Sequence, residues 1–579
     1  MKYILWLSIL VGSFAQASDD WVAKSNENAM VFLNAIAEFT PEVLGRIGVD
    51  GIDEDILDLK PELPQRIQAK FNQVITELKK RLKTEKHPAI RQDIEILLGS
   101  IETEAEDFRL KAQMIYGWSK IAESVFTGIQ FLLDDQIPEE RRGAALVRLK
   151  KYAGMAPGYR PIAHLAKERV EEQLAKKGLL WPIKSELEQY FGNSSRYLAG
   201  IEQLFEKYQI SGYRKAFEAL RAQSDEYNHF LKTRVLPHAR EDFRLPPAIY
   251  ENNLRQMGIT ISPEALIERS QVAFFEIIQE MNALAPLVAA KLGIEAQDYR
   301  DVLRELKKKQ FEGDAILPHY RERNRQLEAL IRKHGIVSLP KRDLNIRLAS
   351  EAESARVPAP HMVPPRLLGN TGELGEFVLP LRIPSADGKQ NLQFDDFCFE
   401  AASWTLSVHE ARPGHELHFA SIVEKGVSLP RILSFNVVNG EGWALYMEAV
   451  MKPYLPLEGQ LISLQHRLLR AARAFLDPQL QLGLTTPQKA KQLLVDRVVI
   501  SEALAGQEVE RYTYRMPGQA PSYFFGYTNL MGLRTELELA LGDRLDLKAY
   551  HDFVLAQGLL PHDWLRKAVL NEFLPSVAP

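Results

Sequence analysis

A helical repeat that runs through most of the chain constrains its fold more than any other feature of the sequence. From Trp21 to about Leu236, apolar residues recur at intervals of three and four, as in WVAKSNENAMVFLNAIAEF and PQRIQAKFNQVITELKKRL. A further helix is predicted to start at SPEA, with Ser262 as its N-cap and Pro263 at its first position. Long helices then continue to about Gly335, and the chain is helical again from Leu457. The repeat predicts a mainly α-helical protein.

The pattern changes between Leu344 and Pro384, where the sequence predicts a small β-sheet. Short apolar runs such as IRLAS and GEFVLPLRI are bounded there by glycine and proline residues. Pro380 marks an edge strand, because proline has no N–H to donate to a sheet ladder.

The first 17 residues, MKYILWLSILVGSFAQA, have the pattern of a secretory signal peptide. One lysine precedes an apolar stretch that is shorter than a membrane span, and Ala15-Gln16-Ala17 forms an A-x-A cleavage signal. The stretch contains no cysteine for lipid attachment. We expect a periplasmic or secreted protein without a membrane anchor. The alternative interpretation is a buried first helix.

Charge and cysteine content argue against several kinds of partner and chemistry. Lys and Arg are dispersed, the formal net charge is −4 and the isoelectric point is about 6.4. Nothing in the sequence therefore indicates binding to nucleic acid or to an anionic membrane. The single cysteine, Cys398, cannot form an intrachain disulfide, and it is predicted to be a small buried hydrophobe because no neighbour in sequence activates it. The oligomeric state stays open.

The segment from Thr405 to Met447 holds the residue types that bind a catalytic zinc ion. It contains SVHEARPGHELHF and NGEGWALYM, and so offers His409, Glu410, His415 and Glu441. In zinc hydrolases, three protein ligands leave one position open to a water molecule, which a neighbouring carboxylate deprotonates. We predict that His409, His415 and Glu441 bind zinc, the metal that two imidazoles and a carboxylate favour, and that Glu410 is the general base.

The spacing of the two histidines requires a break in the helix. In the common motif H-E-x-x-H, the ligands are four residues apart on one face of a helix. His409 and His415 are six apart and would lie on different faces of a regular helix. Pro413-Gly414 stands between them, and proline in a helix interior removes a hydrogen bond and costs about 3 kcal/mol. We therefore expect a break there that returns His415 to the metal.

Glu441, the third predicted ligand, lies on a second predicted helix. It shares one face of that helix with Leu445 and Glu448, which follow at i+4 and i+7. Glu441 is the better ligand candidate, and Glu448 is placed to orient a ligand by a hydrogen bond. Taken alone, a glutamate at a helix start is more simply explained by its favourable interaction with the helix dipole.

These motifs resemble those of the bacterial domain-of-unknown-function family 885. The family pattern is HExxPGH, EGWALY and a later RYxxxPGQAxSYxxG. The chain carries HEARPGH, EGWALY and RYTYRMPGQAPSYFFG, the last from Arg511 to Gly526, and the resemblance extends from about Asp20 to the C-terminus. Two departures occur: PGHELH replaces the more frequent PGHHLQ, at Glu416 and His418, and the family tends to carry a histidine near Gln481.

The resemblance implies a large helical zinc peptidase of the gluzincin type, like thimet oligopeptidase, with a small β-sheet near the active site. In such enzymes a strand beside the metal aligns an extended substrate, a role that Gly375 to Leu379 would take here. The alternative is a sheet that only packs. On this basis residues 1–17 are the signal peptide, residues 18–340 a helical scaffold or lid region, and residues 341–579 the catalytic region.

The late motif supplies candidates for the remaining catalytic roles. Hydrolysis of a peptide bond needs a donor for the developing oxyanion. We predict that Tyr523 and Tyr512 provide it, with Arg511 as a carboxylate clamp. The aromatic cluster around these tyrosines is also dense enough for plain core packing.

Taken together, the residues and the resemblance predict a secreted zinc-dependent peptidase. A short peptide is the expected substrate, because the resembling enzymes enclose the metal in a deep channel. Two alternatives stay open. One is a periplasmic peptide-binding protein without catalysis, against which the retained Glu410 argues. The other is a metal-free hydrolase in which Glu410 and His415 act as an acid and base pair.

Overall fold

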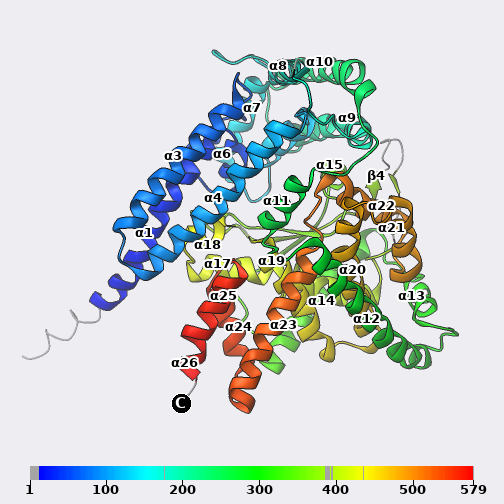
Figure 1. Ribbon diagram of the computed structural model, residues 1–579. Coiled ribbons are helices and arrows are strands. Elements are labelled where there is room, and N and C mark those ends of the chain that lie inside the picture. Colours follow the sequence, from blue (N-terminus) through cyan, green and yellow to red (C-terminus); the bar gives the residue numbers. More distant parts are fainter. Residues whose placement is uncertain (1–11, 175, 385–390, 393–394, 435, 578–579) are drawn as a thin grey trace, which may run out of the picture.

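The protein is mainly α-helical, as the sequence predicts. The structure is a computed structural model that describes residues 12–577 except 175, 385–390, 393–394 and 435 (Figure 1). Helices make up most of this part of the chain, and its strands form a three-stranded and a two-stranded sheet. Residues 1–11 of the predicted signal peptide lie outside the described residues, and residues 12–17 open the first helix.

The long helices α1 (Gly12–Ala37), α3 (Leu63–Thr84) and α4 (Pro88–Met114) and the short helix α2 (Pro41–Ile47) form the N-terminal layer of the molecule, on the left of Figure 1. They share an apolar core with α17 (His415–Lys425) and α18 (Leu429–Leu433), from the other end of the chain. The buried carboxylate of Asp93 in α4 joins the two parts, because it accepts hydrogen bonds from Ser25 of α1 and from Ser428.

A second group of helices, at the top of Figure 1, has a core of its own. Its members are α5 (Ile121–Gln130), α6 (Glu139–Arg142), α7 (Ala144–Tyr152), α8 (Ile162–Leu174), α9 (Lys184–Lys207), α10 (Arg214–Phe230), η1 (Leu231–Val235) and η2 (Leu236–His238). The short helix α15 (Glu351–Arg356) inserts Ala352 and Ala355 into this core. It thereby links the second group to the small sheet.

The largest core surrounds α20 (Leu457–Gln481), nearly all of whose residues are buried. The other helices of this part are α11 (Pro247–Met257), α12 (Pro263–Leu292), α13 (Tyr299–Lys307), η3 (Gly313–Ala315), α14 (Ile316–His334), α16 (Glu400–Glu410), α19 (Val437–Met451), η4 (Lys452–Tyr454), α21 (Pro487–Leu493), η5 (Leu494–Val498), α22 (Glu502–Glu510), η6 (Arg511–Arg515), α23 (Ser522–Leu541), η7 (Gly542–Arg544), α24 (Leu547–Ala556), α25 (His562–Ala568), η8 (Val569–Phe573) and α26 (Leu574–Val577). A helix enclosed on all sides is normally apolar all round. In α20, however, Arg470 and Arg473 are buried, and buried charges require partners.

Helix α12 begins where the sequence predicts. The Ser262 side chain accepts a hydrogen bond from the backbone N–H of Ala265, and Pro263 occupies the first helical position. Within the described part of the chain, α12 alone is long and apolar enough to cross a membrane by length and composition. In the folded chain it packs along α20.

The small sheet is present, but the strand that precedes Pro380 is not at its edge. β1 (Asn345–Leu348) pairs in parallel with β3 (Glu376–Leu379), and β2 (His361–Val363) pairs with β3 in the antiparallel direction. A second pair joins β4 (Ile383–Pro384) to β5 (Asn391–Leu392). β3 is therefore the central strand of three, with both of its edges occupied. The prediction that Gly375 to Leu379 form an edge strand that pairs with a substrate is wrong, because β1 and β2 already occupy those hydrogen-bonding groups.

Helices α19 and α23 cross at a point where two glycines bring their backbones into contact. A Cβ on Gly442 would lie 2.6 Å from the Cα of Gly526, and a Cβ on Gly526 would lie 2.0 Å from the carbonyl oxygen of Val438. These positions are the glycines of EGWALY and of SYFFG. The close crossing accounts for the glycine in each motif and fixes the helix that carries Glu441 against the helix that carries Tyr523.

Gly526→Ala is expected to destabilise the protein by about 1–3 kcal/mol or more, because a new methyl group must displace a helix backbone. Gly532→Ala on the same helix is the matched control, since a Cβ there meets nothing within 4 Å. The control should be neutral or stabilising by up to about 1 kcal/mol, because alanine is the better helix former. Thermal and denaturant unfolding of both variants measure the difference. Equal stability of the two variants would show that the crossing tolerates a side chain.

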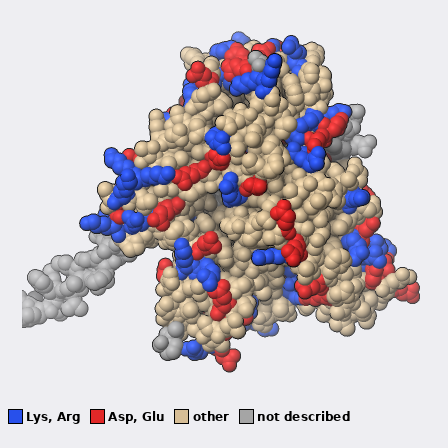
Figure 2. All heavy atoms as spheres, in the orientation of Figure 1, with Lys and Arg blue, Asp and Glu red and all other residues tan. Residues whose placement is uncertain are grey.

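Charged side chains are mixed on the face drawn in Figure 2. Lys and Arg lie in small groups beside Asp and Glu, with uncharged surface between them. Ion pairs such as Arg141 with Asp53 and Lys70 with Glu38 are examples of this pairing. This face of the described residues thus carries its charges in mixed groups, as the dispersed sequence pattern predicts.

Candidate metal centre

His409 and His415 lie on two consecutive helices, α16 and α17, which a tight turn connects. α16 ends one residue after His409, and α17 begins at His415. Gly414 is required in this turn, because a Cβ there would lie 2.0 Å from the carbonyl oxygen of His409. The indole N–H of Trp443 in α19 donates to the carbonyl oxygen of Pro413 at 3.0 Å. The predicted break in the helix at Pro413-Gly414 is confirmed.

Arg412 and Glu416 hold the turn from inside the protein. The Arg412 guanidinium donates to a Glu416 carboxylate oxygen at 2.7 Å and to Glu328 of α14 at 2.7 Å. Glu416 is 1% exposed. Its neighbour His418 is fully buried, and burial lowers the pKa of that imidazole to about 3. Glu416 therefore stabilises the turn through Arg412, and His418 lies in the core as a neutral ring.

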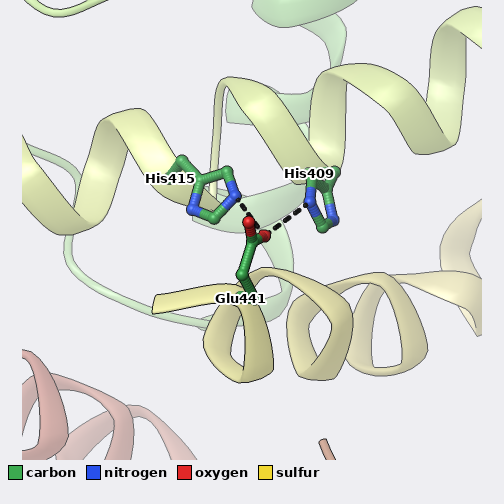
Figure 3. Close-up of side chains that lie close together, drawn as sticks. All are labelled: His409, His415 and Glu441. Carbon is green, nitrogen blue, oxygen red and sulfur yellow. Dashed lines mark hydrogen bonds and ion pairs between the residues drawn. The ribbon is translucent and has the colours of Figure 1, made fainter. Parts of the chain in front are cut away.

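The turn brings His409, His415 and Glu441 together (Figure 3). Their candidate ligand atoms all lie within 4.8 Å of one another. The Nε2 atoms of His415 and His409 lie 3.0 and 3.5 Å from the same Glu441 oxygen. Burial opposes ionisation of Glu441, but the adjacent His415 and His409 hold the pKa of its carboxyl well below the usual range. The geometry places two imidazole nitrogens and one carboxylate around one point.

Glu448 lies behind this cluster and orients His409. Its Oε1 atom lies 2.7 Å from His409 Nδ1, and the Thr405 hydroxyl donates to its other oxygen at 3.2 Å. Burial opposes ionisation of Glu448, but Arg470 and His409 outweigh it and lower the pKa to about 2. A carboxylate on Nδ1 fixes the tautomer of the ring and leaves Nε2 to face the cluster. The i+7 spacing in α19 predicts this position for Glu448.

Glu410 occupies the last position of α16, beside His409, and lines a cavity next to the cluster. Glu410 is 7% exposed. Burial raises the pKa of the Glu410 carboxyl to about 7. A buried carboxylate beside the three candidate ligands is placed to exchange a proton with a small molecule in that cavity.

The structure brings Tyr523 and Arg511 to the cavity and places Tyr512 elsewhere. The Tyr523 ring stacks on the His409 ring with centroids 6.1 Å apart, and its hydroxyl accepts a hydrogen bond from Arg511 Nη2 at 2.9 Å. Burial raises the pKa of the Tyr523 hydroxyl, so it keeps its proton near neutral pH. The Tyr512 hydroxyl instead donates to Glu508 at 2.6 Å. Of the two tyrosines, Tyr523 lines the cavity beside His409 and Tyr512 does not.

The later motif forms its own hydrogen-bond network. Gly518 has a φ of 90° and donates its N–H to both oxygens of Asp477 at 3.0 Å. Gln519 accepts a hydrogen bond from Arg511, which holds that guanidinium at the cavity. Gln481, near which the family tends to have a histidine, donates to the carbonyl oxygen of Tyr512 at 2.8 Å. Gln519 and Gln481 therefore hold η6, which carries Arg511, and Gly518 joins the same segment to α20.

Sequence reasoning missed several residues that line this cavity. The cavity has a volume of about 80 Å³, and α20 contributes His466, Arg470 and Arg473 to its wall. The stretch LLRAARAFLDPQL contains a signal for the arginines, because two arginines three positions apart interrupt the apolar run from Leu468 to Leu476. Ala359 and Pro360, which precede β2, line the same cavity. The chain just before β2 thus reaches the cavity.

The fold and the site define a mainly helical protein in which α16, α17 and α19 bring two histidines and one glutamate together. Two imidazoles and one carboxylate this close together could hold a metal ion. The chain belongs to the family described as "Bacterial protein of unknown function (DUF885)", whose model matches residues 41–569. The predicted family is confirmed, whereas its likeness to gluzincin peptidases stays a prediction.

Two solved structures share this fold over nearly the whole chain. One is a predicted lipoprotein from Colwellia psychrerythraea, with 20% sequence identity and a TM-score of 0.70, covering 95% of this chain and 99% of the other. The second is a predicted lipoprotein of unknown function from Shewanella oneidensis, with 20% identity and a TM-score of 0.67, covering 94% and 99%. No curated protein matches the sequence.

Proposed function

We propose that this chain is a zinc-dependent peptidase that hydrolyses short peptides with a metal-activated water molecule. The single observation that carries the proposal is the convergence of His409, His415 and Glu441 on one point, with ligand atoms within 4.8 Å of one another. Zinc held by nitrogen and oxygen at 2.0–2.1 Å in a tetrahedral arrangement needs ligand atoms about 3.3 Å apart. The Nε2 to Oε2 distances of 3.0 and 3.5 Å fit that requirement.

Each neighbouring residue has a role in this chemistry. When bound, zinc lowers the pKa of a water molecule and polarises the carbonyl group of the substrate. Glu410 takes the proton of the water and delivers it to the leaving amine. Tyr523 donates its hydroxyl proton in a hydrogen bond to the developing oxyanion. Glu448 keeps His409 in the orientation that points Nε2 at the cluster.

The proposed substrate is a short peptide, and the proposed location is the periplasm or the exterior of the cell. The cavity beside Glu410 has a volume of about 80 Å³, which suits the end of a small molecule and not a folded protein. The secretory pattern of residues 1–17 supports the location. Two proteins of the same fold are described as predicted lipoproteins, which agrees with it.

The full chain purified without chelators is expected to contain about one equivalent of zinc and to cleave members of a mixed peptide library while leaving an intact folded protein uncut. Elemental analysis and mass spectrometry of the products provide the two measurements. Removal of zinc with a chelator should abolish cleavage, and added zinc should restore it. Efficient cutting of the folded protein would contradict the small-substrate proposal.

Two other outcomes of the same experiment identify the rival functions. Recovery of a bound peptide that is whole indicates a peptide-binding protein without catalysis. Cleavage that persists after complete zinc removal indicates a metal-free hydrolase, in which Glu410 and His415 act as an acid and base pair.

A further inference from the structure

Three arginines surround the ring of Tyr523 on the wall of the cavity. The guanidinium carbons of Arg473, Arg511 and Arg470 lie 4.7, 5.2 and 5.8 Å from the centre of that ring. All three line the cavity that also contains His409 and Glu410. We call Arg470, Arg473 and Arg511 the arginine wall.

The arginine wall contains three guanidinium groups, but its ion pairs involve two carboxylates, those of Glu508 and Glu448. Arg473 makes a two-pronged ion pair with Glu508, at 2.8 and 2.7 Å, and Arg511 lies 3.6 Å from the same carboxylate. Arg470 lies 3.5 Å from Glu448, which already binds His409. Among the described residues, the ion pairs of three guanidiniums therefore share two carboxylates. A third anion would balance the wall.

Arg470 is the member with the weakest partners. It is 6% exposed, and its buried Nε atom has no hydrogen-bond partner among the described residues. The Nη1 atom of Arg470 donates to the carbonyl oxygen of His466, and this hydrogen bond is long at 3.3 Å. A guanidinium stays charged at all physiological pH values, and a buried charge without full pairing costs free energy. Buried donors of this kind call for a partner that the folded chain does not supply.

We propose that the arginine wall binds the free C-terminal carboxylate of a short peptide, so that this chain is a carboxypeptidase-type exopeptidase. The proposal rests on the peptidase function proposed above. A carboxylate is planar and accepts two hydrogen bonds side by side, which matches the fork of a guanidinium. The anion that would pair with the arginine wall is thus a carboxylate, the group found at the C-terminal end of a peptide.

Distances place this carboxylate close to the bond that is cleaved. The centre of the Tyr523 ring lies 6.1 Å from the centre of the His409 ring and 4.7–5.8 Å from the guanidinium carbons of the wall. Because an extended residue spans about 3.3–3.6 Å, only a few residues fit between the cluster and the wall. Hydrolysis breaks the amide C–N bond, the water oxygen bonds to the acyl carbon, and the leaving amine takes a proton. The products are a shortened peptide acid and a C-terminal amino acid or short fragment.

The test compares three versions of one peptide on the zinc-loaded full chain. The first has a free C-terminal carboxylate, the second a C-terminal amide, and the third an amide with glutamic acid as its last residue. The wild-type protein is expected to cleave the free acid with a kcat/KM that is roughly 30-fold or more above that of the amide, because the amide leaves the buried wall unpaired. Preference for the third peptide over the second would instead assign the wall to an acidic side chain.

Arg470→Gln should reduce the ratio of kcat/KM for the free acid to kcat/KM for the amide to about 1, mainly through a higher KM for the acid. Arg511→Gln is a second variant that should lower the same ratio, and comparing acid with amide in that one protein cancels any general loss of rate caused by removing the Arg511–Tyr523 hydrogen bond. Arg467→Gln is the matched control, because Arg467 lies on the same helix but pairs with Glu280 at the surface. The control should keep the preference of the wild type.

A binding measurement separates failure of this proposal from failure of the peptidase function. N-acetylalanine and N-acetylalaninamide are titrated calorimetrically into the wild-type and Arg470→Gln proteins, with and without zinc. Peptide cleavage without preference for the acid overturns the carboxylate site and leaves the peptidase function standing. Tighter binding of the acid to the wild type, lost in the variant, supports the site even when no peptide is cut. Absence of both cleavage and selective binding overturns both proposals.

Discussion

Glu410→Gln is expected to keep its zinc and to lose peptide hydrolysis by roughly 10²- to 10⁴-fold, the range for removal of a positioned general base. Glutamine has nearly the same shape as glutamate but cannot accept the proton of the water. The ligands His409, His415 and Glu441 are unchanged, so metal binding should survive. Initial rates on one peptide, together with elemental analysis of the same preparation, measure both quantities.

Glu276→Gln provides the control for this variant, because Glu276 lies at an exposed position of α12. It should retain full activity. Unchanged activity in Glu410→Gln would assign the base to another residue. Loss of zinc together with activity would instead make Glu410 a metal ligand.

His415→Ala is expected to lower zinc affinity by more than about 100-fold, because mutation of groups that merely orient metal ligands already costs 10- to 100-fold. The protein should then be isolated nearly free of zinc and should be inactive. His334→Ala is a matched control, since the exposed His334 ring stacks on Tyr454 at the surface. Titration of zinc against a competing chelator gives the affinities. Stoichiometric, tightly bound zinc in His415→Ala would remove His415 from the site.

The parts of the fold and site that depend on local sequence were predictable. Apolar spacing indicated the helices, and Ser262 with Pro263 indicated the start of α12. Pro413-Gly414 indicated the break between α16 and α17, because proline in a helix interior removes a backbone hydrogen bond. The i+7 spacing placed Glu448 behind the cluster, where it contacts His409. These features follow from backbone geometry within a few residues.

The parts that depend on long-range packing were not predictable. Pro380 suggested that β3 was an edge strand, but strands β1 and β2 pair with both of its sides, and pairing partners are a tertiary property. Tyr512 and Tyr523 looked equivalent in the sequence, but the π-helical turn η6 directs Tyr512 to Glu508. The arginine wall combines α20 with η6, and no local pattern links Arg470 to Arg511.

The contact between α1 and α18 has a consequence for the time course of folding. The backbone N–H of Leu429 donates to the side chain of Asn26, 403 positions earlier in the chain. The Asp93 carboxylate accepts hydrogen bonds from Ser25 and from Ser428, which lie on the two sides of this contact. The apolar face of the N-terminal layer is therefore completed only after residues near 430 have been synthesised. Closing such a distant contact is slow relative to local helix formation. The N-terminal layer is therefore the first part of the chain to be made, but it cannot complete its contact with α18 until most of the chain is present.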